Sequence, residues 1–165
     1  MTDTSTAGRA FGPLAALVLT AAPVIAAAVV GNLATLPNLA PWYAGLAKPW
    51  FNPPDRVFGP AWTLLYLAMI AAFFRVLRRE PTPTRRAAIV WFLAQIVINA
   101  LWSVAFFAGR SPLAGLVVIA ALWPAIALTI CAFARLDRLA ALLLVPYLAW
   151  VSFAAVLNLA VWWLN

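Results

Sequence analysis

The sequence predicts an all-α membrane protein built as a bundle of five transmembrane helices. Of its 165 residues, 67% are hydrophobic and only 9% are charged, and the mean hydropathy is +1.00. Soluble domains are only about half apolar. The apolar residues also form continuous runs, whereas the strands of a membrane barrel alternate apolar and polar residues. Because a spanning helix needs about 20 apolar residues, the hydrophobic part of the chain accommodates five helices joined by mostly short connections.

Each predicted span is an apolar run bounded by charged residues, Pro or Gly. The runs cover residues 11–30, 57–77, 87–108, 112–134 and 139–164. The first resembles a secretory signal, but its apolar stretch exceeds the roughly 7 to 15 residues usual in such signals. We therefore expect it to remain as a helix that follows a disordered segment, residues 1–10, within one domain over residues 11–165. Four prolines within or at the start of spans predict kinks that open space between helices: Pro23, Pro60, Pro124 and Pro146.

The connections differ in character. The longest, predicted over residues 31–56, is rich in Pro, Trp and Tyr. Because Trp and Tyr favour the membrane interface, we expect it to pack over the bundle as a cap. The connection after the second span is cationic and is expected to lie beside anionic headgroups.

The Lys and Arg residues predict the orientation in the membrane. Eight of them fall on the side of that cationic connection and three on the other side. The positive-inside rule therefore predicts a cytoplasmic N-terminus, with an inverted or dual topology as the alternative.

Composition excludes several function classes. The net charge of +7 does not indicate nucleic-acid binding, since the cations lie between apolar runs rather than on one soluble face. The chain has no His, which removes the commonest general base and metal ligand, so no metal site is expected. The acids Asp3, Asp55, Glu80 and Asp137 all fall outside the predicted spans, which argues against a proton-coupled exporter. The lone Cys131 is expected to be a small buried hydrophobe.

Three amides lie inside predicted spans. Gln95 and Asn99 are four residues apart and share a helix face, and Asn158 lies in the last span. An amide that faces lipid is costly, so all three are expected to point inward. They form interhelical hydrogen bonds on one interpretation and contact a ligand on the other.

Nine tryptophans are an unusual number for a chain of this length. Trp42, Trp162 and Trp163 suit an interfacial belt. Trp62, Trp102 and Trp150 lie farther from the connections and are expected to face the interior. There they serve either as core packing or as aromatic walls for a flat, conjugated ligand.

Several motifs have a specific order and spacing. Residues 42–54 read WYAGLAKPWFNPP, and residues 57–66 read VFGPAWTLLY. NALW at residues 99–102 is followed by Phe106, Phe107 and Arg110, and PYLAW at residues 146–150 is followed by Leu157 and Asn158. These stretches resemble the TspO/MBR family, the tryptophan-rich sensory proteins also called translocator proteins or peripheral-type benzodiazepine receptors.

The resemblance implies a five-helix bundle, usually a homodimer, whose first loop closes over a pocket. It also implies binding of porphyrins, notably protoporphyrin IX, and of synthetic benzodiazepine-site ligands. Some bacterial members support light-dependent porphyrin breakdown, and the aromatic pair in that chemistry corresponds to Trp62 and Trp150. The ligand-binding positions that the resemblance implies are Tyr43, Trp50, Phe51, Pro53, Pro54, Trp62, Asn99, Trp102, Tyr147, Trp150 and Ala154.

The chain departs from the family pattern in two places. Phe51 stands where many members have Trp, although Trp50 beside it can substitute. Leu159 and Trp163 occupy the positions of the Tyr and Arg that take part in sterol recognition in animal members, so we expect cholesterol to bind poorly. The absence of His and the expected burial of Cys131 favour a metal-free porphyrin over axially ligated haem.

The leading hypothesis is a bacterial cell-membrane receptor or sensor that binds a tetrapyrrole and needs no other cofactor. Its ring would stack on Trp62, Trp102 and Trp150, and its propionates would reach Lys48 or Arg56. One alternative is light-dependent porphyrin degradation by Trp62 and Trp150. Another is a porphyrin or small-molecule transporter without an intramembrane acid to couple it to protons.

Overall fold

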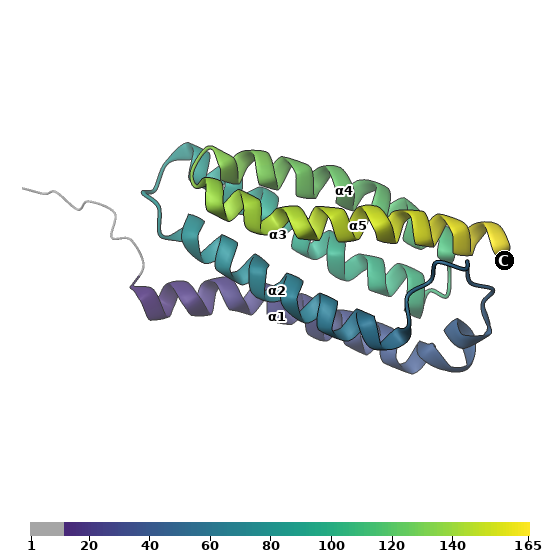
Figure 1. Cartoon of the computed structure of the whole chain (residues 1–165). Coiled ribbons are helices and arrows are strands. Elements are labelled where there is room, and N and C mark those ends of the chain that lie inside the picture. Colours follow the sequence, from purple (N-terminus) through teal and green to yellow (C-terminus); the bar gives the residue numbers. More distant parts are fainter. Residues whose placement is uncertain (1–11) are drawn as a thin grey trace, which may run out of the picture.

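The computed structural model describes residues 12–165, in which every regular element is a helix. Five of these helices are long and apolar enough to cross a membrane, and Figure 1 shows them lying side by side along one axis. They are α1 (Pro13–Thr35), α2 (Asp55–Leu77), α3 (Pro83–Ser103), α4 (Pro112–Ala134) and α5 (Arg138–Leu164). The predicted five-helix bundle is confirmed. The segment predicted to be disordered, residues 1–10, lies outside the described residues.

The helices pack in a closed ring. Each lies most extensively against two neighbours, in the order α1, α2, α5, α4, α3 and back to α1. The rings of Phe73 and Phe92 stack at 4.2 Å between centroids, and those of Phe92 and Phe133 lie 5.8 Å apart. All three side chains are buried. These contacts hold α2, α3 and α4 together in the core, close to the one end of the bundle at which both α2 and α4 end.

Side-chain caps set three of the helix starts. The side chains of Thr82, Ser111 and Asp137 each accept a hydrogen bond from the backbone N–H three residues later, at 3.2, 3.1 and 3.0 Å. Pro83 and Pro112 follow two of these caps, where the missing N–H of Pro costs nothing. The α4 helix therefore has its predicted bounds. The α3 helix begins at residue 83, four residues before its predicted start, because Thr82 and Pro83 form a helix start within a polar stretch.

The first helix is longer than predicted, and the first connection is shorter. The α1 helix continues to Thr35, and a 3₁₀ turn η1 (Leu36–Asn38) and a π-turn η2 (Leu39–Tyr43) follow it. The connection proper covers residues 44–54 rather than 31–56. Gly31 does not end the helix. A Cβ at this position would lie 3.3 Å from the Ser103 Oγ, so Gly31 lets α1 approach α3 closely.

The other bounds differ little from the predictions. The α2 helix begins at Asp55 rather than residue 57, with the Asp55 carboxylate in the first turn, where the helix dipole favours an anion. The α5 helix begins one residue early, at Arg138. After α3, a π-turn η3 (Val104–Ala108) carries the helical path to the predicted end at residue 108. The four prolines at which kinks were predicted all lie inside helices: Pro23, Pro60, Pro124 and Pro146.

Cys131 does not lie where it was predicted. Its side chain is exposed on α4, whereas Thr129 and Phe133 on either side are fully buried. In a membrane helix both the core face and the lipid face are apolar, so an apolar run does not show which face a residue takes. The prediction of a buried Cys131 is therefore wrong.

The charged residues divide between the two ends of the bundle. We call the end formed by the α2–α3 and α4–α5 connections the arginine-rich end. Among residues 12–165 it holds seven arginines: Arg75, Arg78, Arg79, Arg85, Arg86, Arg135 and Arg138. We call the other end, with the connection at residues 44–54, the α3–α4 turn and the end of α5, the loop end (Figure 1). Its cations are Lys48, Arg56 and Arg110.

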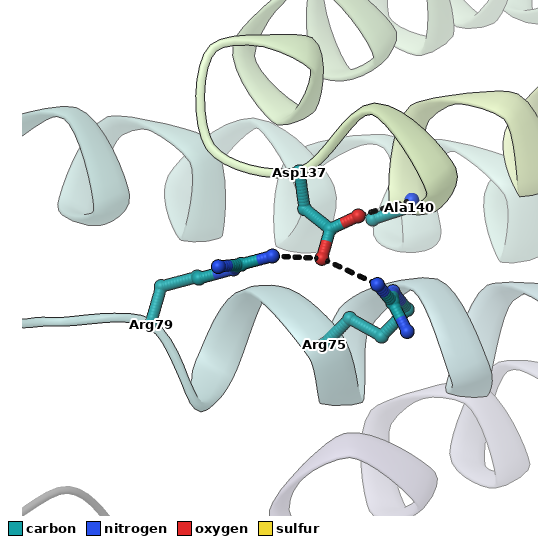
Figure 2. A network of polar contacts seen from close by, with 4 residues as sticks. All are labelled: Arg75, Arg79, Asp137 and Ala140. Atoms are coloured by element: carbon teal, nitrogen blue, oxygen red, sulfur yellow. Dashed lines mark hydrogen bonds and ion pairs between the residues drawn. The ribbon is translucent and has the colours of Figure 1, made fainter.

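An ion-pair cluster ties α2 to α5 at the arginine-rich end. One Asp137 carboxylate oxygen lies 2.9 Å from Arg75 and 2.5 Å from Arg79, and the other accepts the N–H of Ala140 (Figure 2). The side chain of Asp137 is only 3% exposed. Burial alone would raise the pKa of this carboxyl. The hydrogen bonds from Arg79, Ala140 and Arg75 and the charge of Arg75 outweigh burial and hold that pKa well below its ordinary value.

Candidate functional site

The connection at residues 44–54 lies against the end of α5 (Figure 1). The side-chain amide of Asn165 accepts the N–H of Ala47 at 3.0 Å and donates to its carbonyl at 3.1 Å. The Lys48 ammonium donates to the carbonyl oxygen of Tyr43 at 2.7 Å and sits 4.5 Å from the centre of the Tyr43 ring. The Asn165–Ala47 pair therefore fastens this aromatic and Pro-rich segment to the end of α5, and Lys48 ties its first half together.

Beneath the connection, four aromatic rings form a row from the loop to α5 and then to α2. The ring of Phe51 lies 6.4 Å from that of Phe153, which lies 5.9 Å from that of Trp150. The Trp150 ring in turn meets Phe58 of α2 at 5.9 Å, nearly edge to face. Contacts of this geometry add favourable energy to simple burial. We refer to Phe51, Phe153, Trp150 and Phe58 as the aromatic row.

Deeper in the bundle, a polar group adjoins another set of rings. The Trp62 ring lies 5.3 Å from Tyr66 and 6.3 Å from Tyr147. The Asn99 amide nitrogen donates to the Tyr147 hydroxyl oxygen at 3.0 Å, and the Tyr66 hydroxyl donates to the Asn99 amide oxygen at 3.4 Å. These four residues, Trp62, Tyr66, Asn99 and Tyr147, come from α2, α3 and α5 and form what we call the polar-aromatic centre.

Trp102 belongs to a separate network. Its indole N–H donates to the Asn158 amide oxygen at 3.2 Å, and the Asn158 amide nitrogen donates to the Pro112 carbonyl at 2.7 Å. The indole also stacks on Phe106 at 5.3 Å. The helix α4 approaches closely here because residue 115 is Gly, where a Cβ would lie 2.8 Å from the Asn158 amide oxygen. The α3, α4 and α5 helices are thus held together beside the polar-aromatic centre.

Comparison with known proteins places this arrangement in a family. A statistical model of the TspO/MBR family matches residues 19–164. The chain belongs to the TspO/MBR family. The match includes the connection, the aromatic row and the polar-aromatic centre. With its five apolar helices, this TspO/MBR chain is an integral multi-pass membrane protein.

Relatives of this TspO/MBR chain occur in bacteria, archaea and animals. It is 47% identical over 131 residues to "Tryptophan-rich protein TspO" of Chlorobaculum tepidum, with 78% of this chain and 83% of the relative covered. It is 41% identical to the protein of the same name in Archaeoglobus fulgidus, with 90% and 96% covered. It is 38% identical to the human "Translocator protein", with 73% of each chain covered.

The structure of the TspO/MBR chain divides the predicted ligand-binding residues into two adjoining clusters. One packs on the main core of the bundle and includes Trp62, Tyr147, Trp150 and Ala154. The other packs around Phe106 and Phe107 and includes Tyr43 and Phe51. Trp102 touches both clusters. The indoles of Trp62, Trp102 and Trp150 are half-buried on the sides of helices that face their neighbours.

Other predicted residues lie outside these clusters. Trp50 is 95% exposed, and its ring meets that of Phe51. Pro53 is half-buried, and Pro54 is exposed just before α2 begins. Of the two cations predicted to contact propionates, Lys48 is engaged with the backbone of the connection, whereas Arg56 is exposed in the first turn of α2.

The three predicted inward-facing amides are all buried, as expected. Asn99 and Asn158 make the interhelical hydrogen bonds described above. Gln95 is only 1% exposed, and neither atom of its side-chain amide has a hydrogen-bond partner among residues 12–165. An unsatisfied amide in a membrane interior is costly. Gln95 thus differs from the other two amides in offering both a donor and an acceptor to the bundle interior.

Sequence reasoning missed several residues that shape the site. Tyr66 lies four residues after Trp62 and so on the same face of α2, a spacing that could have identified it. Phe58 lies four residues before Trp62 on that face. The contacts of Phe153 and of Asn165 depend on how the connection folds back, and no local signal indicates them. Arg110, whose φ of 48° lies in the left-handed region, donates to the Asn38 side chain at 3.1 Å.

Proposed function

We propose that this protein is a membrane receptor or sensor that binds a tetrapyrrole of the protoporphyrin IX type. Family membership and the five spans support a membrane receptor or sensor, since its relatives are named as tryptophan-rich and translocator proteins. The observation that carries the ligand proposal is the convergence of Trp62, Trp150 and Tyr147 beneath a fastened connection. Flat aromatic side chains are suited to stack on a flat conjugated ring.

The two ends of the ligand would meet different chemistry. The macrocycle would displace ring-to-ring contacts of the aromatic row, with the Asn99 amide beside it as a polar anchor. The propionates would lie toward the loop end, where Arg56, Lys48 and Arg110 outnumber the single acid Asp55 among the described residues. Arg56 is the stronger propionate ligand of the predicted pair, because the Lys48 ammonium already donates to backbone carbonyls.

Access to this site requires the connection to move. The rings of Phe51 and Phe153 are in contact, so a macrocycle enters between α2 and α5 only when Phe51 is displaced. The bonds that hold the connection to α5 are two exposed hydrogen bonds between Ala47 and Asn165. Exposed hydrogen bonds contribute little net stability, so opening is inexpensive. The ligand would be a metal-free porphyrin, because the chain has no His to ligate iron and Cys131 is exposed on α4, which contributes no residue to the aromatic row.

A porphyrin titration tests the proposal. Protoporphyrin IX is added to the detergent-solubilised protein while its absorption band and the Trp fluorescence are followed together. We expect saturable binding, and we expect Trp62→Phe with Trp150→Phe to raise Kd about tenfold, the equivalent of roughly 1.4 kcal/mol of lost aromatic contact. Trp91→Phe, in α3 near the arginine-rich end, is the matched control. Unsaturable binding, or equal effects of all the variants, would contradict the proposal.

A second candidate function is light-dependent porphyrin degradation. The observation that favours it is the contact of Trp62 with two tyrosines, Tyr66 and Tyr147. Such phenols can return an electron to a neighbouring indole after it has reduced an excited porphyrin. We expect illumination of the complex in air to produce a new tetrapyrrole absorption band that is absent in the dark. The band should disappear in Trp62→Phe and Trp150→Phe if these residues are catalytic.

The proposal also covers the orientation of the protein in the membrane, its assembly as a homodimer and its selectivity against cholesterol. The arginine-rich end would face the cytoplasm of a bacterial cell by the positive-inside rule, which places the connection and the ligand entrance on the outer side. The family resemblance supports a homodimer. Cholesterol is not expected as a ligand, because Leu159 and Trp163 replace the sterol-recognition pair. Labelling of Glu80→Cys, at an exposed position of the arginine-rich end, by a membrane-impermeant thiol reagent in a Cys131→Ser background tests the orientation, and crosslinking in whole cells tests the dimer.

A further inference from the structure

A groove lies at the arginine-rich end, where the start of α3 meets the end of α4. Its volume is about 380 Å³, within the roughly 300–1,000 Å³ usual for small-molecule sites. One face of each helix lines it, with residues 83, 84, 87 and 91 from α3 and residues 128, 131, 132 and 135 from α4. None of these residues belongs to the aromatic row or the polar-aromatic centre, so the groove is separate from the proposed tetrapyrrole site.

The groove runs from the polar helix ends into the apolar part of the bilayer. Arg135 caps the end of α4, and Leu128 lies seven residues earlier, about 10 Å deeper at 1.5 Å per residue. Trp91 lies eight residues after the start of α3, about 12 Å deep. Trp91 and Leu128 are 39% and 45% exposed, so the deep end faces lipid, and Ala87 and Ala132 are the small residues between them and the polar end. An occupant must be polar at one end and apolar at the other.

Within the described chain, the positive charge at the polar end of the groove has no acidic partner. The Arg135 guanidinium is exposed and makes no hydrogen bond or ion pair with residues 12–165. The positive end of α3 and the negative end of α4 lie side by side here, each equivalent to about half a charge, and largely cancel. Of the described acids at this end, Asp137 is bound by Arg75 and Arg79, and neither it nor Glu80 lines the groove. The charge of Arg135 therefore favours an anion.

Trp91 adds a neutral hydrogen-bond donor to the groove. Helical side chains lean toward the N-terminus of their helix, so this indole leans from the deep end toward the arginine-rich end. Its N–H donates to no acceptor among residues 12–165, whereas the N–H of Trp123, also exposed on α4, donates to the Ser152 hydroxyl at 2.9 Å. A Trp N–H away from water usually has a partner. The groove thus offers a cation, then a neutral donor, then an apolar floor.

We propose that the groove binds an anionic glycerophospholipid, whose phosphate, ester carbonyl and acyl chain follow one another in this same order. The phosphate lies at Arg135 and the exposed hydroxyl of Thr84. An ester carbonyl accepts the N–H of Trp91, and one acyl chain continues past Ala87 and Leu128. A zwitterionic lipid fills the floor equally well but brings a second cation to Arg135. A second copy of this chain in a parallel dimer is also a poorer occupant, because it brings another arginine-rich end to the same membrane level.

Native mass spectrometry of the detergent-solubilised full chain tests the phosphate contact. Phosphatidylglycerol and phosphatidylcholine with identical acyl chains are titrated, and the affinity of the first bound lipid is measured. We expect phosphatidylglycerol to bind at least about fivefold more tightly, and Arg135→Gln to lose about fivefold of that preference. Arg138→Gln removes the same charge from the same end outside the groove and should leave the preference unchanged. Equal affinity for the two lipids, or an equal loss in both variants, overturns the proposal.

An ether-linked phosphatidylglycerol tests the contact at Trp91, because it keeps the charge and the chains but has no ester carbonyl. We expect the ester lipid to bind about threefold more tightly than the ether lipid, as one modest hydrogen bond would give. Trp91→Phe should abolish this difference, and Trp123→Phe, outside the groove, should preserve it. An ester preference that is absent from the parent chain, or that survives Trp91→Phe, overturns the proposal.

Filling the groove tests the acyl-chain contact. Ala87→Trp should weaken binding of both lipids, whereas Val90→Trp, exposed on the same helix outside the groove, should not. Inorganic phosphate alone should not compete with phosphatidylglycerol at the same concentration, and effective competition would identify a free anion site and overturn the lipid assignment. Unchanged lipid binding in Ala87→Trp also overturns the proposal, and a changed dimer fraction in that variant would then assign the groove to a second copy.

Discussion

The side-chain amide of Asn99 donates a hydrogen bond to the hydroxyl oxygen of Tyr147 at 3.0 Å, joining α3 to α5 inside the bundle. Both residues are buried, and Tyr147 also contacts the Trp62 ring. The Asn99 amide oxygen also accepts from the Tyr66 hydroxyl of α2 at 3.4 Å, so this one side chain links α2, α3 and α5. The polar-aromatic centre therefore depends on one interhelical amide, which makes it a sensitive point for mutation.

Removing the Tyr147 hydroxyl should weaken the bundle. Tyr147→Phe leaves the Asn99 amide nitrogen without this acceptor, and interhelical hydrogen bonds in membranes contribute about 1 kcal/mol. We expect the thermal midpoint in detergent to fall by a few degrees. In a double-mutant cycle with Asn99→Leu, the two changes should couple by about 1 kcal/mol. Strictly additive effects would show that the bond contributes nothing measurable.

At Gln95 we expect a substitution to raise the stability of the bundle rather than lower it. Its buried amide has no hydrogen-bond partner among the described residues, so Gln95→Leu removes a polar group whose burial is uncompensated. Such groups cost about 1–3 kcal/mol. We expect Gln95→Leu to raise the thermal midpoint of the ligand-free protein, whereas Asn99→Leu on the same face lowers it. A fall with Gln95→Leu would mean that the amide is satisfied in the folded protein.

The pH dependence of stability should reveal the Asp137 cluster. The pKa of Asp137 is held below the ordinary value of 3.8 by Arg79, Ala140 and Arg75 despite burial. A carboxyl whose pKa is lowered in the folded state contributes stability that is complete above its unfolded pKa. That stability is lost as the pH falls toward the folded pKa. We therefore expect thermal unfolding in detergent to show a steep loss of stability below about pH 4.

Asp137→Asn is the matched control for that titration, because Asn still caps α5. It should be less stable than the parent at neutral pH, since Arg75 and Arg79 then lack a carboxylate. Its stability should vary much less between pH 4 and pH 2. A variant that loses stability over this range as steeply as the parent would assign the acid transition to other groups.

The sequence predicted the fold more fully than the site, for reasons that particular residues make plain. The bounds of α4 were predictable because Ser111 and Pro112 are a local start signal. The inward direction of Asn99 followed from the cost of an amide that faces lipid, and its spacing to Gln95 put both amides on one face. Its partner Tyr147 lies 48 residues away, and no local pattern encodes that pairing. Cys131 was misplaced because a bilayer makes the outer face of a helix as apolar as the inner one.

The connection was the hardest part to predict. Its composition correctly indicated a segment packed on the bundle, but Gly31 was interpreted as the end of α1 when it serves a close approach to α3. Trp50 was expected to line a pocket, and its ring lies in the open beside Phe51. The side chains of Asn165 and Lys48 bond to backbone atoms of residues 43–47, and a backbone partner leaves no trace in the pattern of side chains.

The bond between Asn165 and Ala47 should control opening of the connection. Asn165→Ala removes the acceptor for the Ala47 N–H, so hydrogen exchange at that amide should become faster. Asn165→Asp keeps an acceptor oxygen for the Ala47 N–H, loses the amide nitrogen that donates to the carbonyls of Ala47 and Val161, and should keep most of the protection. Neither change should shift global unfolding by more than about 1 kcal/mol, because the site is exposed. Unchanged exchange in Asn165→Ala would show that the bond between Asn165 and Ala47 does not hold the connection closed.

Gly115 provides a test of the close packing beside Trp102. An added Cβ would lie 2.8 Å from the Asn158 amide oxygen and 2.8 Å from the Phe106 ring. Gly115→Ala must therefore displace groups that hold the Trp102 indole, and overpacking of this kind costs about 1–3 kcal/mol. Gly59→Ala in α2 is the matched control, because nothing lies within 4 Å of its added Cβ. Since Ala favours a helix over Gly by about 1 kcal/mol, Gly59→Ala should leave the thermal midpoint unchanged or raise it. If both variants behave alike in thermal unfolding, α4 is free to shift and the contact between Gly115 and Asn158 does not fix the position of Trp102.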